Sequence, residues 1–238
     1  MIFDIANKIK RKWMKFRLQP IRVFCFHQVS ETFDASTMYS GDWTQTEQFK
    51  RNIEQLKKQY IFIPLREAHQ KLQHDAVRCK RYAVLTADDG WASLKNILPW
   101  LAEQEIPITL FVNPAYLKGE ETRENGMNGL LTWDDLKELL ALYTNISIAS
   151  HGWNHALATD VEIFDFQETT IKSVHYLRRF KNYIPFYAYP CGNHTKDTDA
   201  ILENAGIVPV YMDGKMNYGY GGGIHRELLD GVIVNSEK

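Results

Sequence analysis

Two adjacent carboxylates are the first residues whose types and spacing suggest chemistry. Asp88 and Asp89 follow a mostly apolar run and precede Gly90. Neighbouring carboxylates repel each other unless a cation neutralises one of them, and successive side chains at a strand end point in different directions. One carboxylate could therefore bind a metal ion while the other faces a substrate. The alternative is a structural turn or a helix N-cap, since Asp-Gly is a common turn dipeptide.

Two histidines four residues apart could supply the other ligands. His151 and His155 fall on one face if the chain completes one turn between them. Two imidazoles and a carboxylate leave positions open for water and substrate, as in catalytic rather than structural zinc sites. A metalloprotease motif is disfavoured because Gly152 replaces its glutamate. Iron oxygenases use the same ligand types, but Asp88 favours a hydrolase, which needs a base near the water that its metal activates.

The elements that must position these residues follow a repeated βα pattern. Short apolar or β-branched runs predict strands at residues 22–27, 61–64, 82–88, 108–113, 146–151, 186–190 and 207–212. Amphipathic spacing predicts helices at residues 46–60, 65–73, 93–104, 133–143, 166–180 and 198–205. Three of the strands end in polar or turn residues, and parallel α/β folds carry their chemistry at the carboxyl ends of strands. We therefore predict a single α/β domain with about seven parallel strands.

Composition and charge narrow the class of protein. The 238 residues are 45% hydrophobic and 13% aromatic, which is enough to bury the core of one large domain. A formal net charge of −1 gives no electrostatic reason to expect nucleic acid as a partner, so the expected substrate is neutral or small. Cys25, Cys79 and Cys191 form neither a CxxC pair nor a disulfide framework, which indicates reduced thiols.

Residues 1–20 form a separate basic and amphipathic segment. They mix six lysines and arginines with large apolar side chains, and they contain no continuous apolar run typical of a signal peptide or a membrane span. We interpret them as a helix that either packs on its own domain or makes weak contact with a membrane surface. Residues 21–238 are the predicted folded domain. The expected location is the cytoplasm or the inner face of the membrane.

Three motifs resemble, in order and spacing, those of the polysaccharide deacetylase family, which is carbohydrate esterase family four and is also called the NodB-homology domain. They are TADDG at residues 86–90, SHGWNH at residues 150–155 and AYPCG at residues 188–192. The resemblance implies a distorted (β/α) barrel with one divalent metal ion at the carboxyl ends of its strands. It also implies removal of acetyl groups from N-acetylated amino sugars or, less often, from O-acetylated sugars.

The resemblance assigns roles to the motif residues. Asp88 would be the catalytic base, and the metal ligands would be Asp89, His151 and His155. We expect zinc, although this ligand set also accepts cobalt, nickel or iron. Cys191 would act through its backbone N–H, which in the family helps to hold the oxyanion. A nucleophilic role for its thiol is disfavoured, because no motif pairs it with a base.

The third motif departs from the family pattern. Many members have an arginine where this chain has Ala188 and a tyrosine where it has Cys191. That arginine would orient and ionise Asp88. Arg226 is one residue that could replace it.

The expected general acid is His27. The segment Phe-Cys-Phe-His-Gln-Val at residues 24–29 resembles the N-terminal motif of the branch that deacetylates poly-N-acetylglucosamine, in which the motif order is permuted and the third-motif arginine tends to be absent. The alternative for His27 is a strand-end histidine bonded to backbone. His225 is the candidate nearest the C-terminus, but its surroundings do not look like the motif in which the family usually places this acid.

Aromatic residues beside the motifs could contact the substrate. Trp91 and Trp153 are the best candidates to stack on sugar rings. The other candidates are Trp43, Trp133 and Tyr189, which precedes Pro190 in the third motif. Aromatic residues belong more often to the core.

Two other functions stay open for this chain. It could be an esterase that acts on O-acetylated sugars, or a carbohydrate-binding protein that kept the fold without catalysis.

Overall fold

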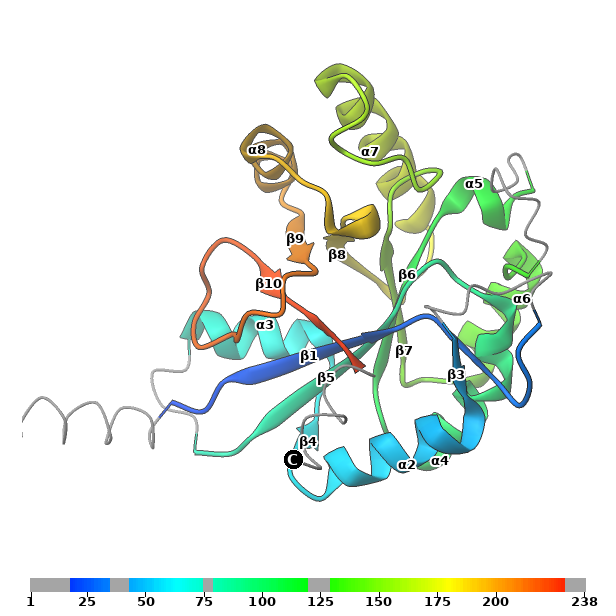
Figure 1. Cartoon of the computed structure of the whole chain (residues 1–238). Coiled ribbons are helices and arrows are strands. Elements are labelled where there is room, and N and C mark those ends of the chain that lie inside the picture. Colours follow the sequence, from blue (N-terminus) through cyan, green and yellow to red (C-terminus); the bar gives the residue numbers. More distant parts are fainter. Residues whose placement is uncertain (1–17, 35–42, 75–78, 120–128, 230–238) are drawn as a thin grey trace, which may run out of the picture.

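Parallel strands form the centre of the protein, and the helices lie around them (Figure 1). The computed structural model describes residues 18–34, 43–74, 79–119 and 129–229. The main strands are β1 (Ile21–Phe26), β5 (Tyr82–Ala87), β6 (Ile108–Val112), β7 (Ile146–Ser150), β8 (Tyr183–Ala188) and β9 (Val208–Tyr211). They are hydrogen-bonded in the order β9-β8-β7-β6-β5-β1, and β4 (Ile61–Phe62) pairs with the start of β5.

A short segment near the C-terminus closes the barrel. β10 (Ile224–His225) pairs with β9, whereas β11 (Glu227–Leu228) pairs with β1. Only Arg226 separates them, so this segment joins the two outer strands of the sheet. Counted as one strand, it completes a nearly closed barrel of eight parallel strands among the described residues, with β4 included. The prediction of a distorted α/β barrel in a single domain is confirmed.

Seven helices surround the barrel in the described part of the chain. They are α2 (Thr46–Lys57), α3 (Leu65–His74), α4 (Leu98–Glu103), α5 (Pro114–Leu117), α6 (Trp133–Leu142), α7 (Ile163–Leu177) and α8 (Lys196–Asn204). The six predicted helices are confirmed near their expected positions, but the one at 93–104 is divided into the 3-10 helix η1 (Ala92–Asn96) and α4, which carries a proline in its first turn. Thr132 and Thr195 begin α6 and α8 with capping boxes, which fix where these helices start.

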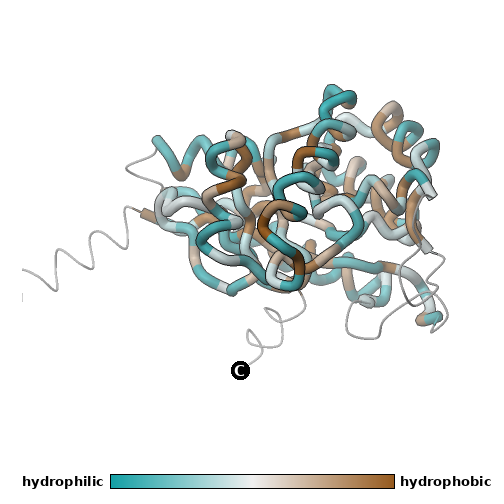
Figure 2. Tube along the Cα trace, turned by 90° about the horizontal axis from the view of Figure 1, so that it is seen from above, coloured by the Kyte–Doolittle hydropathy of each residue, from teal (hydrophilic) through white to brown (hydrophobic). Residues whose placement is uncertain are grey.

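Buried side chains fill the space inside and outside the barrel. Alternate strand residues such as Val84, Phe111 and Phe186 belong to one core cluster, together with the apolar face of α3. The other strand face packs against α2, α4 and α6, and α7 and α8 cover β8 and β9. Hydrophilic and hydrophobic residues alternate along the outer helices (Figure 2), as expected for helices that bury one face.

One small sheet lies apart from the barrel. β2 (Gln28–Ser30) continues the chain from β1 and pairs in parallel with β3 (Trp43–Gln45). The backbone N–H of Val29 donates to the hydroxyl of Ser93 on η1 at 3.4 Å, which ties the pair to the barrel. The sequence did not predict this pair.

The basic segment predicted at residues 1–20 lies mostly outside the residues that the structure describes. Residues 1–17 are not among the described residues, so the basic segment, its contact with a membrane and the domain boundary stay predictions. Among the described residues, no helix combines the length and the apolar character needed to cross a membrane.

Candidate metal centre and catalytic site

The three predicted metal ligands come together at the carboxyl ends of two strands. Asp89 follows β5, whereas His151 directly follows β7 and His155 lies four residues further on. One potential ligand atom from each residue lies within 4.8 Å of the other two. Asp89 Oδ1 is 3.5 Å from Nε2 of His151 and 3.4 Å from Nε2 of His155. These donor atoms converge on one point, as the open three-ligand site of a catalytic metal requires.

The backbone of this site adopts an unusual conformation. Asp89, His155 and Cys191 have φ values of 71°, 60° and 53°, in the left-handed region that side chains other than glycine rarely adopt. Glu105 is the one other non-glycine residue with positive φ in the described part of the chain. Strained backbone of this kind tends to occur at functional sites, where the surrounding structure holds it.

A backbone carbonyl fixes the orientation of His151. Its Nδ1 lies 2.9 Å from the carbonyl oxygen of Ala188 and must carry the proton, because a carbonyl only accepts. This tautomer leaves the lone pair of Nε2 directed at Asp89, the arrangement common in metal-bound histidines. Burial of the ring also lowers the pKa of His151, which favours the neutral imidazole that binds metals.

Other hydrogen bonds fix Asp89 and the histidine loop. The indole N–H of Trp91 donates to Asp89 Oδ2 at 3.0 Å, so the other oxygen faces the histidines. The Asn113 amide donates to the carbonyls of His151 and Gly152, and the Ser173 hydroxyl donates to the Gly152 carbonyl at 3.2 Å. The ligand loops are thus held in place by Asn113, which follows β6, and by Ser173 on α7.

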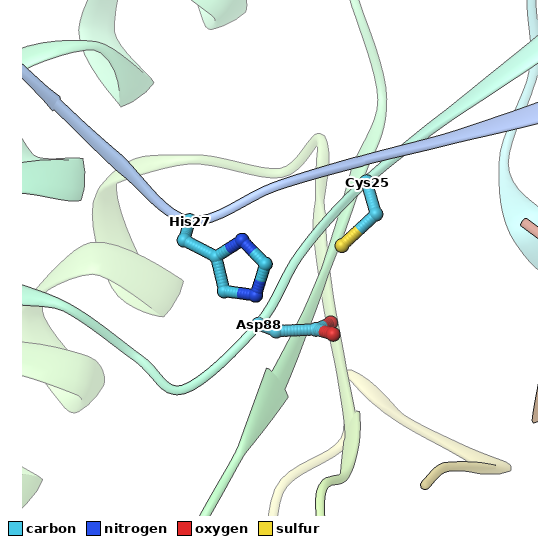
Figure 3. Close-up of side chains that lie close together, drawn as sticks. All are labelled: Cys25, His27 and Asp88. Atoms are coloured by element: carbon cyan, nitrogen blue, oxygen red, sulfur yellow. The ribbon is translucent and has the colours of Figure 1, made fainter. Parts of the chain in front are cut away.

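A second group of potential ligands lies nearby but suits a cation less well. The side chains of Cys25, His27 and Asp88 point toward one another (Figure 3), and their potential ligand atoms also lie within 4.8 Å. Both Asp88 oxygens, however, already accept hydrogen bonds from Arg226. Burial raises the pKa of the Cys25 thiol, which keeps it protonated and a poor ligand. Asp89, His151 and His155 are therefore the better candidate metal site.

Asp88 forms a buried, bidentate ion pair with Arg226. Nη1 and Nη2 of Arg226 lie 2.7 and 2.8 Å from the two Asp88 oxygens, and both residues are almost fully buried. Burial alone would raise the pKa of Asp88, but the charge and hydrogen bonds of Arg226 outweigh it and hold that pKa well below its usual range. The carboxylate is therefore ionised.

The environment of Arg226 explains its position. Nη1 also donates to the Thr86 hydroxyl at 3.2 Å and lies 3.5 Å from the Cys25 sulfur, and the guanidinium lies 5.0 Å from the centre of the Phe111 ring. Burial works against the charge, but Asp88 raises the pKa of Arg226 above its ordinary value. The hypothesis that Arg226 could take the place of the arginine absent at Ala188 thus agrees with its contacts. The sequence signal for its strand was only the short alternation Ile-His-Arg-Glu-Leu.

The two candidate acids have different surroundings. His27 follows β1, is half-buried and directs its ring toward Asp88 (Figure 3). His225 is the last residue of β10, and its Nδ1 lies 2.9 Å from an oxygen of Asp213. The geometry brings His27, and not His225, to the predicted base.

The residues expected to bind substrate are mostly buried. Trp91, Trp153 and Tyr189 are 0%, 3% and 1% exposed, and Pro190 is buried beside them. Lys172 Nζ lies 3.8 Å from the centre of the Trp153 ring, and the Tyr189 hydroxyl donates to Asp199. The predicted sugar stacking on these rings gains no support from the structure. Cys191, by contrast, is exposed at the 3-10 turn η2 (Pro190–Gly192).

Comparison with known families identifies the chain. The family model described as "Polysaccharide deacetylase" matches residues 75–210, which is more than half of the 238 residues. The chain belongs to the polysaccharide deacetylase family. None of the curated protein sequences matches it significantly.

Solved structures share the fold at low sequence identity. IcaB from Ammonifex degensii is 21% identical, with a TM-score of 0.73 over 89% of this chain and 92% of that one. The deacetylase PplD from Streptococcus pyogenes, solved in complex with acetate, is 17% identical, with the same TM-score and the same coverage of both chains. A de-N-acetylase from Aggregatibacter actinomycetemcomitans is 15% identical, with a TM-score of 0.67 over 88% of this chain and 94% of that one.

Proposed function

We propose that this protein removes acetyl groups from N-acetylated amino sugars in oligo- or polysaccharides by metal-dependent hydrolysis. The observation that carries the proposal is an ionised, buried base directly beside a set of three metal ligands. His151 Nε2 lies 3.5 Å from the ligand oxygen of Asp89 and 3.9 Å from an oxygen of the base Asp88. A base and a metal site this close can act on the same water and the same acetyl group.

The donor set fits one divalent cation, for which we propose zinc. One carboxylate oxygen and two imidazole nitrogens match the ligand types of catalytic zinc, with positions left for water and substrate. When bound, such an ion would polarise the acetyl carbonyl and lower the pKa of water. Because hydrogen bonds fix the side chains of Asp89 and His151 at the ends of their strands, the protein prepares most of this site before substrate arrives.

Each residue near the bound acetyl group has its own role in the proposed reaction. Asp88 accepts a proton from the attacking water, and Arg226 keeps Asp88 ionised and oriented for this step. The backbone N–H of Cys191 donates to the oxyanion that forms at the acetyl carbon. His27 donates a proton to the departing nitrogen as the C–N bond breaks. The products are acetate and a free amine.

The position of His27 favours amide over ester hydrolysis. An amine leaves poorly unless it is protonated, whereas an alcohol depends less on a general acid. His27 sits close to the base, where it could reach the same scissile bond. The similar structure named a de-N-acetylase supports the same choice.

Acetate release from matched substrates tests this function. Zinc-loaded protein is incubated with N-acetylglucosamine oligomers and, separately, with O-acetylated sugars of similar length. We expect faster acetate release from the N-acetylated substrates. Faster release from the O-acetylated sugars would establish an esterase instead. Metal binding without release from either substrate would show a carbohydrate-binding protein.

Replacing Arg226 should slow turnover without removing the metal. Arg226→Met leaves Asp88 without its bidentate partner, and we expect kcat to fall about 100-fold, with KM and bound metal almost unchanged. Arg226→Lys keeps a charge and should lose less. The protein should also unfold at a lower temperature, because a buried charge loses its partner.

The matched control for Arg226 lies on the adjacent strand. Arg22→Met breaks a comparable two-point ion pair, in which Arg22 Nε lies 2.6 Å from a Glu227 oxygen. It should leave kcat unchanged. An equal loss of kcat in both variants would show that the effect of Arg226 is general destabilisation.

Replacing His27 should affect amide substrates most. We expect His27→Gln to lower kcat for N-acetylated substrate by about 100-fold, because the amine must then leave without its acid. O-acetyl hydrolysis should fall much less, and metal content should stay the same. His225→Gln is the control, since His225 pairs with Asp213 away from the base. Equal loss on both kinds of substrate would contradict the role of His27 as an acid.

A further inference from the structure

Two aromatic residues lie in or next to the small sheet of β2 and β3, which continues the chain directly after His27. Phe33 lies three residues beyond β2, and Trp43 begins β3. Their ring centres are 5.6 Å apart at an interplanar angle of 61°. We call these two residues the aromatic ledge.

The strand register places the ledge near the catalytic residues. Trp43 is the parallel partner of Gln28, and Gln28 follows His27 directly. Paired strands lie about 4.8 Å apart and consecutive Cα atoms 3.8 Å apart, so the Cα atoms of Trp43 and His27 are separated by no more than about 9 Å. A short oligosaccharide bound at the catalytic residues could reach across this distance.

Hydrogen bonds hold the ledge in a defined orientation. The indole N–H of Trp43 donates to the Ser30 hydroxyl at 2.8 Å, and that hydroxyl donates to the carbonyl of Thr32 at 2.7 Å. Trp43 is thereby fixed and half-buried, while Phe33 packs its ring against it and stays 41% exposed. Aromatic surface that is already fixed loses little conformational entropy when a ligand packs on it.

The ledge supplies the exposed aromatic surface that the motif residues lack. Trp91, Trp153 and Tyr189 are at most 3% exposed, so their faces are not available to a sugar ring. Pyranose rings present apolar C–H faces that pack on aromatic rings. We infer that Phe33 and Trp43 form a subsite for the sugar unit next to the one that is deacetylated. This inference rests on the proposed function and identifies where a second sugar unit of the oligosaccharide substrate binds.

The dependence of activity on substrate length tests the subsite. Acetate release by zinc-loaded wild type and Phe33→Ala is measured on N-acetylglucosamine monomer and on a pentamer. We expect Phe33→Ala to raise KM for the pentamer about tenfold, with kcat unchanged and no change for the monomer. Trp43→Phe keeps a ring but loses the bond to Ser30, and we expect a smaller rise in KM. Tyr218→Ala is the control, since Tyr218 is similarly exposed (47%) and adjoins Asn217, which bonds to the opposite end of β1.

A binding measurement separates failure of the subsite from failure of the proposed function. Calorimetry with the pentamer should show about tenfold weaker binding to Phe33→Ala than to wild type, whether or not acetate is released. Hydrolysis by wild type with the same pentamer KM in Phe33→Ala would overturn the subsite and leave the deacetylase function intact. Weaker pentamer binding by Phe33→Ala in a protein without hydrolytic activity would support the subsite and contradict the enzyme.

Discussion

Asp88→Asn should reduce turnover of N-acetylated oligomers by roughly 10³–10⁴-fold while the bound metal stays in place. The asparagine side chain has nearly the same shape but cannot accept the proton of the attacking water. Asp88 also differs from its neighbour in its contacts, since both of its oxygens accept from Arg226 and the histidine ligands lie closer to Asp89. The loss should therefore appear in kcat, with little change in metal affinity. The measurements are steady-state acetate release and metal content per chain.

Asp89→Asn is the natural comparison, because the two carboxylates are adjacent in sequence and equally buried. We expect this variant to bind metal more weakly and to recover part of its activity when metal is added in excess. Asp88→Asn should not recover under the same conditions. If the two variants showed the reverse behaviour, the assignment of base and ligand would have to be exchanged.

His151→Ala should remove both metal and activity. Changing a hydrogen-bond partner of a ligand typically weakens metal binding 10–100-fold, and loss of the ligand itself should exceed about 100-fold. His151 is also the most constrained ligand, because its Nδ1 is bonded to Ala188 and the ring is buried. Metal titration followed by calorimetry, with acetate release in parallel, measures both effects.

The control for His151 is a histidine on the neighbouring loop. His194 is bonded to Asp199 and packs on Tyr189, so His194→Ala should retain metal and activity. Metal binding of wild-type strength in His151→Ala would contradict the assigned site. It would direct attention to the second group, formed by Cys25, His27 and Asp88.

Much of the barrel could be predicted from sequence because its strands are continuous apolar runs. β5, β6 and β7 are buried on both faces, and such strands stand out against the amphipathic helices between them. The closing segment was missed for a physical reason. β10 and β11 have two residues each, follow a glycine-rich stretch and are separated by Arg226, so they lack the length and apolar character that mark a strand.

The metal ligands could be predicted because the sequence itself places them at strand ends. Their supporting contacts could not, since these depend on strand register. The carbonyl of Ala188 reaches His151 only because β8 pairs with β7, and Arg226 reaches Asp88 across 138 positions of sequence. Sequence also could not separate exposed from buried aromatic rings. Trp91 stands beside the motif as expected, but its indole N–H is bonded to Asp89 and its surface is buried.

The most direct test of the central claim is a metal titration of activity. The protein is first stripped with a chelator, and zinc is then added stepwise while acetate release from N-acetylglucosamine oligomers is followed. We expect no release without metal, a rise in proportion to added zinc, and saturation at one ion per chain. Full activity in the stripped protein, or saturation with one zinc ion and no hydrolysis of any acetylated sugar, would contradict the assignment of this chain as a metal-dependent deacetylase.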